Sequence, residues 1–229
     1  MTLSVVIPTL NEAGSLPGAL DSAFRVPEVS EVLVVDGGST DGTEALARAR
    51  GCRWIPSARG RGLQCRVGAL AAQSDVVLFL HADTWLPPSA GRAIEAALEG
   101  SAISNPVVGG AFRKRFRDAP WCMRGSRFRS WLWFQLTCRP FADQAIWVRR
   151  SALESVDGYP DLPLMEEFEL VRRLRNVGRV VLLGEVVSTS ARRFRRRGVL
   201  RTYLLMARIL AAHAAGTPPD ELLRRYESA

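Results

Sequence analysis

Short apolar runs alternate with longer segments of helical periodicity along the first third of the chain. An apolar run of about four to eight residues between polar residues is typical of a strand buried on both faces. The segments between the runs favour helices, because residues such as Leu16 and Leu20 fall at helical spacing. Alternating strands and helices predict a parallel sheet with right-handed crossovers. We expect strands at residues 3–9, 31–35, 52–56 and 76–80.

The fourth apolar run stops at His81, Ala82 and Asp83. Open α/β sheets bind their ligands beyond the carboxyl ends of the strands, so we expect Asp83 at the mouth of a crevice. His81 lies two residues earlier and therefore on the same side of the chain. A carboxylate there can hold a divalent cation, and the cation can hold a diphosphate. The alternative is a helix cap, because Asp83 shortly precedes Pro87.

Polar side chains also follow the other predicted strands. Asn11 and Glu12 follow the first strand, and Asp36 opens a glycine-rich loop after the second. Glycine lets backbone approach a ligand closely, although the same loop is also an ordinary tight turn. Arg59 and Arg61 stand at the start of a later helix, where free backbone N–H groups suit an anion. The alternative for these arginines is a solvated basic turn.

The stretch 121–141 mixes aromatic and basic residues. Such a mixture suits a membrane interface, and it also suits sugar stacking or an oligomer contact. Core packing, with arginine stems along it and their charged ends in solvent, is the third interpretation. The residues concerned are Trp121, Arg124, Arg127, Phe128, Arg129, Trp131, Trp133, Phe134, Arg139 and Phe141.

An acidic cluster lies in residues 164–170 and includes Glu166 and Glu167. Neighbouring carboxylates repel one another, and this repulsion raises a pKa towards the range useful for a general base. The alternative is that acidic residues are simply favoured in the first turn of a helix.

The last part of the chain carries four further patterns. Residues 180–183 and 185–190 predict a closing hairpin or paired edge segments, and the arginine run 192–197 is typical of a solvated segment. Residues 201–213 predict an amphipathic helix, and 220–226 a short final helix.

The chain has 229 residues and a formal net charge of +8. The positive excess favours anionic partners, which are phosphates, acidic lipid surfaces or nucleic acid. We find neither an apolar stretch of about 20 residues, as a membrane span needs, nor a signal-peptide layout, so we expect a cytoplasmic protein. The four cysteines lack metal-ligand spacing and are expected to be free thiols.

Three segments in this order and spacing resemble family-2 glycosyltransferases with a GT-A fold. The resemblance implies that Thr9 and Glu12 flank a nucleotide and that Asp36 hydrogen-bonds its base. It also implies that Arg61 and Gln64 lie near the nucleoside or the diphosphate. The segments are SVVIPTLNE at 4–12, VVDGGSTDGT at 34–43 and LFLHAD at 78–83.

The resemblance assigns Asp83 to the last carboxylate of the family's Asp-x-Asp motif, which binds Mn²⁺ or Mg²⁺. His81 stands where the first carboxylate of that motif is usual, and it is a metal ligand, a ribose contact or a spacer. A neutral imidazole suits Mn²⁺ better than Mg²⁺. Ala82 lies between them, and we expect all three residues beside the donor.

The acidic cluster resembles the family's Glu-Asp-x-Glu-Leu segment, which carries the catalytic base. Glu167 takes the place of the usual Asp and is the expected base, with Glu166 as its substitute. Glu is one methylene longer than Asp, so its backbone must sit slightly further back. Arg192 and Arg193 follow the base, where related enzymes close over the donor diphosphate, and either could neutralise the leaving group.

These inferences predict one GT-A-like α/β domain over residues 1–229, with a mostly parallel sheet, flanking helices and a C-terminal helical appendage. Residues 1–105 would bind the nucleotide-sugar, and 106–190 would hold the acceptor and the base. Residues 191–229 would form the basic segment and the C-terminal helices.

The implied activity is the inverting transfer of a sugar from a UDP- or GDP-sugar to an unidentified hydroxyl acceptor, assisted by a divalent cation. A peripheral contact with the inner face of the membrane and a homodimer are further interpretations. One rival class is a basic nucleic-acid-binding protein, but the arginines are dispersed and we expect no nucleic acid partner. The other is a sugar-nucleotide pyrophosphorylase, but residues 11–14 are not its glycine-rich basic loop.

Overall fold

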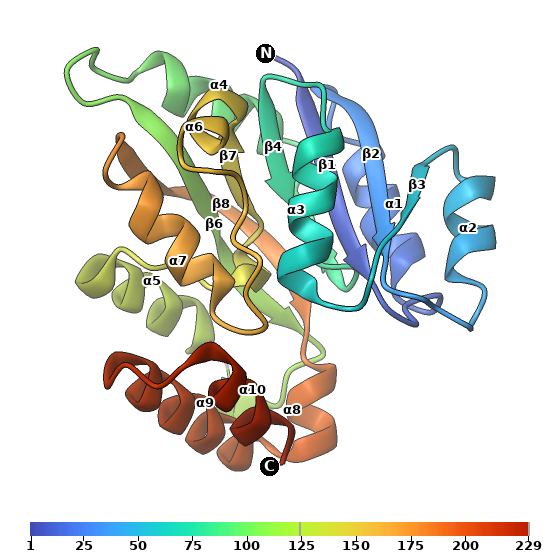
Figure 1. The fold of residues 1–229 in the computed structure, drawn as a ribbon, viewed down its shortest axis with the longest axis vertical. Coiled ribbons are helices and arrows are strands. Elements are labelled where there is room, and N and C mark those ends of the chain that lie inside the picture. Colours follow the sequence, from blue (N-terminus) through green and yellow to red (C-terminus); the bar gives the residue numbers. More distant parts are fainter. Residues whose placement is uncertain (124, 229) are drawn as a thin grey trace.

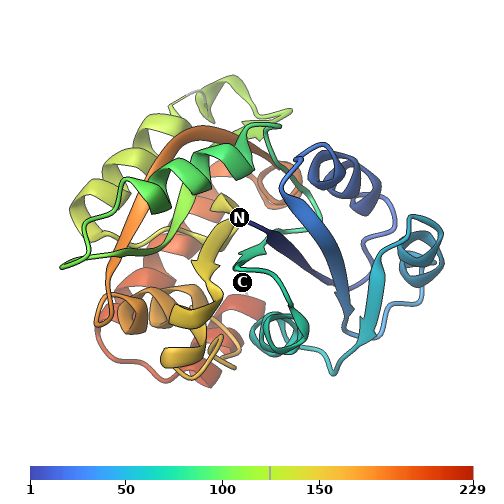
Figure 2. The ribbon, with the colours of Figure 1, turned by 90° about the horizontal axis from the view of Figure 1, so that it is seen from above.

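The computed structural model describes residues 1–123 and 125–228. In this part of the chain, eight strands form one sheet in the order β3-β2-β1-β4-β7-β6-β8-β5. Four of its seven strand pairings are parallel and three are antiparallel. Helices flank the sheet (Figures 1 and 2), which confirms the predicted α/β class. The strands are β1 (Leu3–Thr9), β2 (Val29–Asp36), β3 (Arg53–Pro56), β4 (Val76–Phe79), β5 (Thr84–Trp85), β6 (Val107–Arg117), β7 (Ile146–Arg149) and β8 (Arg179–Ser190).

The parallel half of the sheet is formed by β1 to β4, as the apolar runs predict. Alternate residues of β1 enter two separate cores, with Val5 and Ile7 in one and Val6 in the other. Close packing of the covering helix requires Gly68, because a Cβ there would lie 2.3 Å from the Val6 side chain. The helices of this half are α1 (Leu16–Phe24), α2 (Thr43–Ala49), α3 (Arg61–Ala71) and α4 (Ala90–Glu99).

The other half of the sheet begins where β7 pairs antiparallel with β4. Strand β8 runs parallel to β6 without a break in chain direction, so the predicted hairpin of 180–183 and 185–190 is wrong. The register shifts between Phe112 and Arg113, which pair with Leu183 and Val186. Gly184 and Glu185 are therefore an irregularity within one strand, and they interrupt the apolar pattern as a turn does.

Of the helices that follow the parallel half, the C-terminal ones lie beyond the end of the sheet at which β1 and β4 finish (Figure 1). The C-terminal helices α8 to α10 form the lowest layer in that view, below α5 and α7. A small apolar core of Leu205, Ile209 and Leu222 joins α9 to α10. These helices are α5 (Ser126–Thr137), α6 (Arg150–Ser155), α7 (Glu166–Leu174), α8 (Arg192–Arg197), α9 (Val199–Ala214) and α10 (Pro219–Glu227), with 3₁₀ turns at Trp121–Met123 and Ala142–Gln144.

The aromatic and basic stretch 121–141 divides between core and surface. Trp133 stacks on Phe141 at 5.6 Å and on Phe168 at 6.5 Å between ring centroids, so this part packs inside. Exposed apolar side chains remain at Trp121, Phe128, Leu132 and Leu136. Arg124, which the sequence analysis includes in this stretch, lies outside the described residues. None of the helices in the described residues is long and apolar enough to cross a membrane.

Candidate active site

A pocket of about 210 Å³ opens between the two halves of the sheet and the C-terminal helices. Asp83, from the loop after β4, and Glu167, from the first turn of α7, both line it. Arg61, His81 and Arg193 line it as well. The other residues that the sequence predicts for the site do not line this pocket; they are Thr9, Glu12, Asp36, Gln64, Ala82, Glu166 and Arg192.

Thr9, Asp36 and Gln64 form a buried network at the carboxyl ends of β1 and β2. The Thr9 hydroxyl donates to Asp36 Oδ1 at 2.9 Å, and Gln64 Nε2 donates to the backbone carbonyls of Thr9 and Val35 at 2.7 and 2.8 Å. Burial raises the pKa of Asp36, but hydrogen bonds from Ser39, Thr9 and Gly38 outweigh it and lower that pKa.

The Asp36 carboxylate has no vacant acceptor position. Its Oδ2 accepts the N–H groups of Gly38 and Ser39 at 3.0 and 2.7 Å, and its Oδ1 accepts the hydroxyls of Ser39 and Thr9. A carboxylate accepts about four hydrogen bonds. Asp36 therefore holds the glycine-rich loop against β1, and a nucleoside base must displace one of these donors to bond with it.

Glu12 and Arg192 connect the first loop to α8. Arg192 Nη2 donates to Glu12 Oε1 at 2.7 Å, and its Nη1 donates to the Ser15 hydroxyl at 3.2 Å. Glu12 Oε2 is buried and has no hydrogen-bond partner among the described residues. This ion pair ties the arginine run to the N-terminal half, although the two segments are far apart along the chain.

The surroundings of Asp83 disfavour the ionised form of its carboxylate. Burial and the nearby negative charge of Glu12 raise its pKa, while Arg192 and Arg193 lower it. No side-chain hydrogen bond to this carboxylate exists among the described residues, although the Asp83 backbone carbonyl accepts from Arg117 at 2.8 Å. Burial and the charge of Arg61 lower the pKa of His81 to about 3, so its imidazole is neutral. Ala82 is buried in the core and supplies no polar side chain.

The protein alone does not form a metal cage at this place. The described residues contain no group of three or more His, Cys, Asp or Glu side chains arranged to hold a metal ion. The residues do fit a cation that a substrate phosphate also binds, since Mg²⁺ commonly takes only one or two carboxylates from the protein. The Asp83 carboxylate accepts no hydrogen bond among the described residues. Glu12, whose negative charge raises the pKa of Asp83, has one carboxylate oxygen without a hydrogen-bond partner there.

Glu166 and Glu167 share Arg61 but face different surroundings. Arg61 Nε donates to Glu166, and its Nη2 donates to Glu167 Oε2 at 3.3 Å. Burial, followed by repulsion from Glu166, raises the pKa of Glu167 to about 7 despite Arg61. Only Glu167 of the two lines the pocket. Arg61 thus lies against these carboxylates in the pocket wall, and its place near the nucleoside or the diphosphate stays a prediction.

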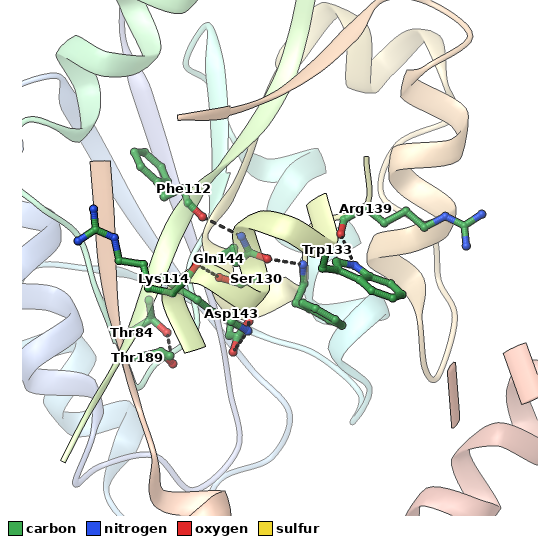
Figure 3. Close-up of polar contacts among 11 residues, drawn as sticks. Thr84, Phe112, Lys114, Ser130, Trp133, Arg139, Asp143, Gln144 and Thr189 are labelled. Carbon is green, nitrogen blue, oxygen red and sulfur yellow. Dashed lines mark hydrogen bonds and ion pairs between the residues drawn. The ribbon is translucent and has the colours of Figure 1, made fainter. Parts of the chain in front are cut away.

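An ion pair between the buried Lys114 and the half-buried Asp143 also lines the pocket, and the sequence did not identify it as part of the site. Lys114 Nζ donates to both Asp143 oxygens at 2.6 and 2.8 Å (Figure 3). Burial raises the pKa of Asp143, but the charge of Lys114 outweighs it and lowers that pKa. The neighbouring Gln144 donates to the Phe112 carbonyl at 2.9 Å and fixes the turn that carries Asp143 (Figure 3).

One sequence signal could have drawn attention to this pair. Lys114 is the only lysine in a chain whose other basic residues are arginines. A compact ammonium group fits between two carboxylate oxygens and the rings of Phe116 and Phe141, at 5.3 and 4.8 Å from their centroids.

The family of the chain is identified by comparison with known proteins. Residues 4–157, two thirds of the chain, match the family described as glycosyl transferase family 2. The chain belongs to glycosyl transferase family 2. This result confirms the resemblance found in segments 4–12, 34–43 and 78–83. The matched part contains Asp83 and ends before Glu167 and the C-terminal helices.

Curated relatives match a shorter part of the chain. The glucosyl-3-phosphoglycerate synthase of Mycobacterium tuberculosis is 34% identical over 93 residues, which are 36% of this chain and 29% of that protein. The 4,4′-diaponeurosporenoate glycosyltransferase of Staphylococcus haemolyticus is 31% identical over 113 residues, which are 44% of this chain and 28% of that protein. The matched stretches thus span less than a third of the length of these two relatives.

Solved structures of glycosyltransferases share the fold. S. aureus TarS 1–349 in complex with UDP has a TM-score of 0.61 at 21% identity, covering 83% of this chain and 60% of that one. The M. tuberculosis glucosyl-3-phosphoglycerate synthase in complex with Mn²⁺, UDP and glucosyl-3-phosphoglycerate has a TM-score of 0.52 at 23% identity. That match covers 82% of this chain and 71% of the synthase. At such identities the likeness is one of fold, and it confirms the predicted GT-A-like architecture.

Proposed function

We propose that the protein transfers a sugar from a nucleotide-diphospho-sugar to an acceptor hydroxyl, with inversion at the anomeric carbon. The observation that carries this proposal is that Asp83 and Glu167, 84 positions apart in sequence, line one pocket from two halves of the sheet. A single inverting displacement needs a leaving-group stabiliser on one side of the anomeric carbon and a base on the other. Glu167 offers the base, and Asp83 offers a ligand for a cation that would stabilise the leaving group.

Glu167 acts as the general base. Its carboxylate takes the proton of the acceptor hydroxyl while the acceptor oxygen forms a bond to the anomeric carbon. The bond between that carbon and the diphosphate oxygen breaks, and the nucleoside diphosphate leaves with the bonding electrons. A general base must be partly ionised near neutral pH and still have a high proton affinity, and a pKa of about 7 meets both requirements. Glu166 does not line the pocket. It accepts a hydrogen bond from Arg61 and is a positioning residue for that arginine.

A divalent cation would be held by Asp83, with His81 and Glu12 beside it. When bound, it supplies positive charge for the departing diphosphate. The structures of the mycobacterial synthase with UDP contain Mn²⁺ or Mg²⁺. Because its imidazole is neutral, His81 can either bind the cation or contact the ribose of the donor.

The arginines and Lys114 complete the charge of the site. Arg193 reaches the pocket wall, where it suits the diphosphate, and Arg192 holds Glu12 in place. Two of the three N–H groups of Lys114 bond to Asp143, and the third remains for a sugar hydroxyl. In this proposal, residues 1–105 bind the donor and residues 106–190 present the acceptor to the base.

Donor binding tests the proposal most cheaply. We expect UDP-glucose, GDP-mannose or dTDP-glucose to stabilise the protein in a thermal shift assay with Mn²⁺, and less so with EDTA. An Asp21→Asn variant, changed in an exposed ion pair with Arg50, is the control and should respond as the parent does. Stabilisation by a DNA oligonucleotide, with none by any nucleotide-sugar, would contradict the proposal.

A cytoplasmic location, contact with a membrane and a homodimer stay predictions. Leu200 and Leu204 of α9 are exposed, as are Phe128, Leu132 and Leu136 of α5. Arg129 of α5 donates to the Tyr203 hydroxyl of α9 at 2.7 Å, so the two helices are joined. Sedimentation with vesicles of anionic lipid tests the membrane contact, and light scattering tests the dimer.

A further inference from the structure

The walls of the pocket differ in chemistry according to where they come from in the chain. Six side chains from the C-terminal helices line it: Arg193, Phe194, Met206, Ile209, Leu210 and Tyr226. All except Arg193 are apolar or aromatic. The polar and charged lining of the pocket otherwise comes from the sheet, its loops and the starts of α3 and α7. The C-terminal helices therefore give the pocket one apolar wall.

This apolar wall is fixed beside the catalytic base. Leu164 and Met165 pack on the core of Leu205, Ile209 and Leu222, and both also line the pocket. They directly precede Glu166 and Glu167, the first two residues of α7. The position of Glu167 and the position of the apolar wall are thus set by the same contact between the segment before α7 and the C-terminal helices.

Aromatic rings extend the same wall on its other side. Phe116 of β6 meets Phe194 of α8 edge-on at 5.1 Å between ring centroids. Phe141 contacts Phe168 of α7 at 5.8 Å. Both Phe116 and Phe141 line the pocket. The rings therefore continue the apolar surface from Phe194 of α8 to Phe141, which packs on α7.

The two kinds of wall suit two different substrates. A donor sugar carries several hydroxyls, and Lys114, Asp143 and Thr189 offer it hydrogen bonds on the polar side. A polyol acceptor placed on the apolar side would lose hydrogen bonds to water without replacement, and each buried unpaired hydroxyl would weaken its binding. An apolar group placed there gains free energy as it leaves water.

We propose that the acceptor carries its reacting hydroxyl on an apolar or aromatic body, which lies against Met206, Leu210 and Tyr226 while the hydroxyl faces Glu167. This inference rests on the proposed glycosyl transfer and names the class of its acceptor. Such an alcohol reaches the pocket either from solution or from a lipid bilayer, and both sources present the same chemistry.

The test compares alcohols in the presence of Mn²⁺ and whichever nucleotide-sugar binds. The apolar set is benzyl alcohol in solution and farnesol in phosphatidylcholine vesicles, and the polar set is glycerol and methyl glucoside. We expect release of nucleoside diphosphate to exceed donor hydrolysis by about tenfold with at least one apolar alcohol. Mass spectrometry should show the corresponding glycoside. Activity with benzyl alcohol indicates a soluble source, and activity with farnesol alone indicates the bilayer.

A variant pair ties the effect to the wall. Leu210→Ser should raise the KM for the apolar acceptor by about tenfold, with donor affinity equal to that of the parent protein. Leu204→Ser on the exposed side of the same helix should change neither. Unchanged donor affinity also shows that the Leu210→Ser protein is folded.

Three results would overturn the acceptor class. They are transfer to the polar set but not to the apolar set, an unchanged acceptor KM in Leu210→Ser, and intact donor binding with no acceleration by either apolar alcohol. A protein that neither binds nor hydrolyses any nucleotide-sugar fails differently, because that result contradicts the proposed glycosyl transfer itself.

Discussion

Asp36 at the end of β2 and Glu167 in the pocket are buried to a similar degree, but their surroundings shift their pKa values in opposite directions. Asp36 accepts bonds from Thr9, Gly38 and Ser39, and its pKa is lowered. Glu167 is also nearly inaccessible, yet burial and Glu166 raise its pKa to about 7. Asp83, without a side-chain donor among the described residues, likewise has a raised pKa.

This difference separates residues that hold the fold from residues that are free for chemistry. A carboxylate with all its acceptor positions filled stabilises a loop, and new partners must compete with existing ones. A buried carboxylate with few donors costs stability and binds a proton or a cation readily. The comparison predicts that substitutions of pocket carboxylates affect turnover or cation binding, whereas substitution of Asp36 affects stability.

The largest effect should come from Glu167→Gln. Gln is almost isosteric with Glu but cannot accept the proton, so we expect transfer to fall by about 10³-fold. Donor affinity should change by less than about threefold, because the base does not bind the nucleotide in this account. Isothermal titration with donor, beside an assay of product, measures the two quantities. Glu169→Gln is the matched control, since Glu169 pairs with Arg172 and Arg173 outside the pocket. Retained turnover in Glu167→Gln would assign the base elsewhere.

Asp83→Asn should have the next largest effect. It removes a negative charge that the cation needs, and we expect Mn²⁺-dependent donor affinity to fall by about 10- to 100-fold. Donor affinity in EDTA should stay near that of the parent protein. Titration of Mn²⁺ at fixed donor concentration measures the change, and an identical metal dependence in the two proteins would remove Asp83 from the cation site.

Asp36→Asn should act mainly on stability. The amide nitrogen of Asn cannot accept the N–H or hydroxyl donors that Asp36 accepts, so at least one buried donor loses its partner. We expect the free energy of unfolding to fall by about 1–3 kcal/mol. Urea denaturation without ligands measures it, with Asp21→Asn as the exposed control. A loss no greater than that of the control would show that the network is dispensable.

Glu167→Gln should have the opposite effect on stability, and a smaller one. The raised pKa means that the folded protein binds this proton more tightly than the unfolded chain does, so ionisation costs stability as pH rises from 4.5 to about 7. Gln avoids that cost. We expect the variant to match the parent near pH 4.5 and to exceed it by about 1–2 kcal/mol at pH 8. Lower stability of the variant at pH 8 would contradict the claim that ionised Glu167 destabilises the folded protein.

The parallel half of the sheet was predictable because its information is local. Each apolar run has the length of a strand, and strand β1 begins and ends where the pattern predicts, at Leu3 and Thr9. The resemblance implies that Thr9 and Asp36 lie at one nucleotide, and the structure pairs them at the ends of neighbouring parallel strands. The family match covers this half of the sheet.

The second half of the sheet and the C-terminal helices were less predictable because their contacts join distant residues. Nothing near Lys114 in the sequence indicates that it pairs with Asp143, which lies 29 positions later. The amphipathic pattern at 201–213 predicts an apolar face but not the surface that it covers. The break at Gly184 reads as a turn, because a strand irregularity and a hairpin use similar residues. In each case the partner, rather than the local pattern, decides the structure.

The pH dependence of kcat/KM for transfer tests the central claim most directly. Glu167 must be ionised to accept a proton, and its pKa is set by burial, the charge of Glu166 and the opposing charge of Arg61. We predict that kcat/KM rises with pH and is half-maximal near pH 7. A profile that is already at its plateau at pH 5.5, about one unit above the ordinary value of 4.5, would contradict a buried Glu167 base.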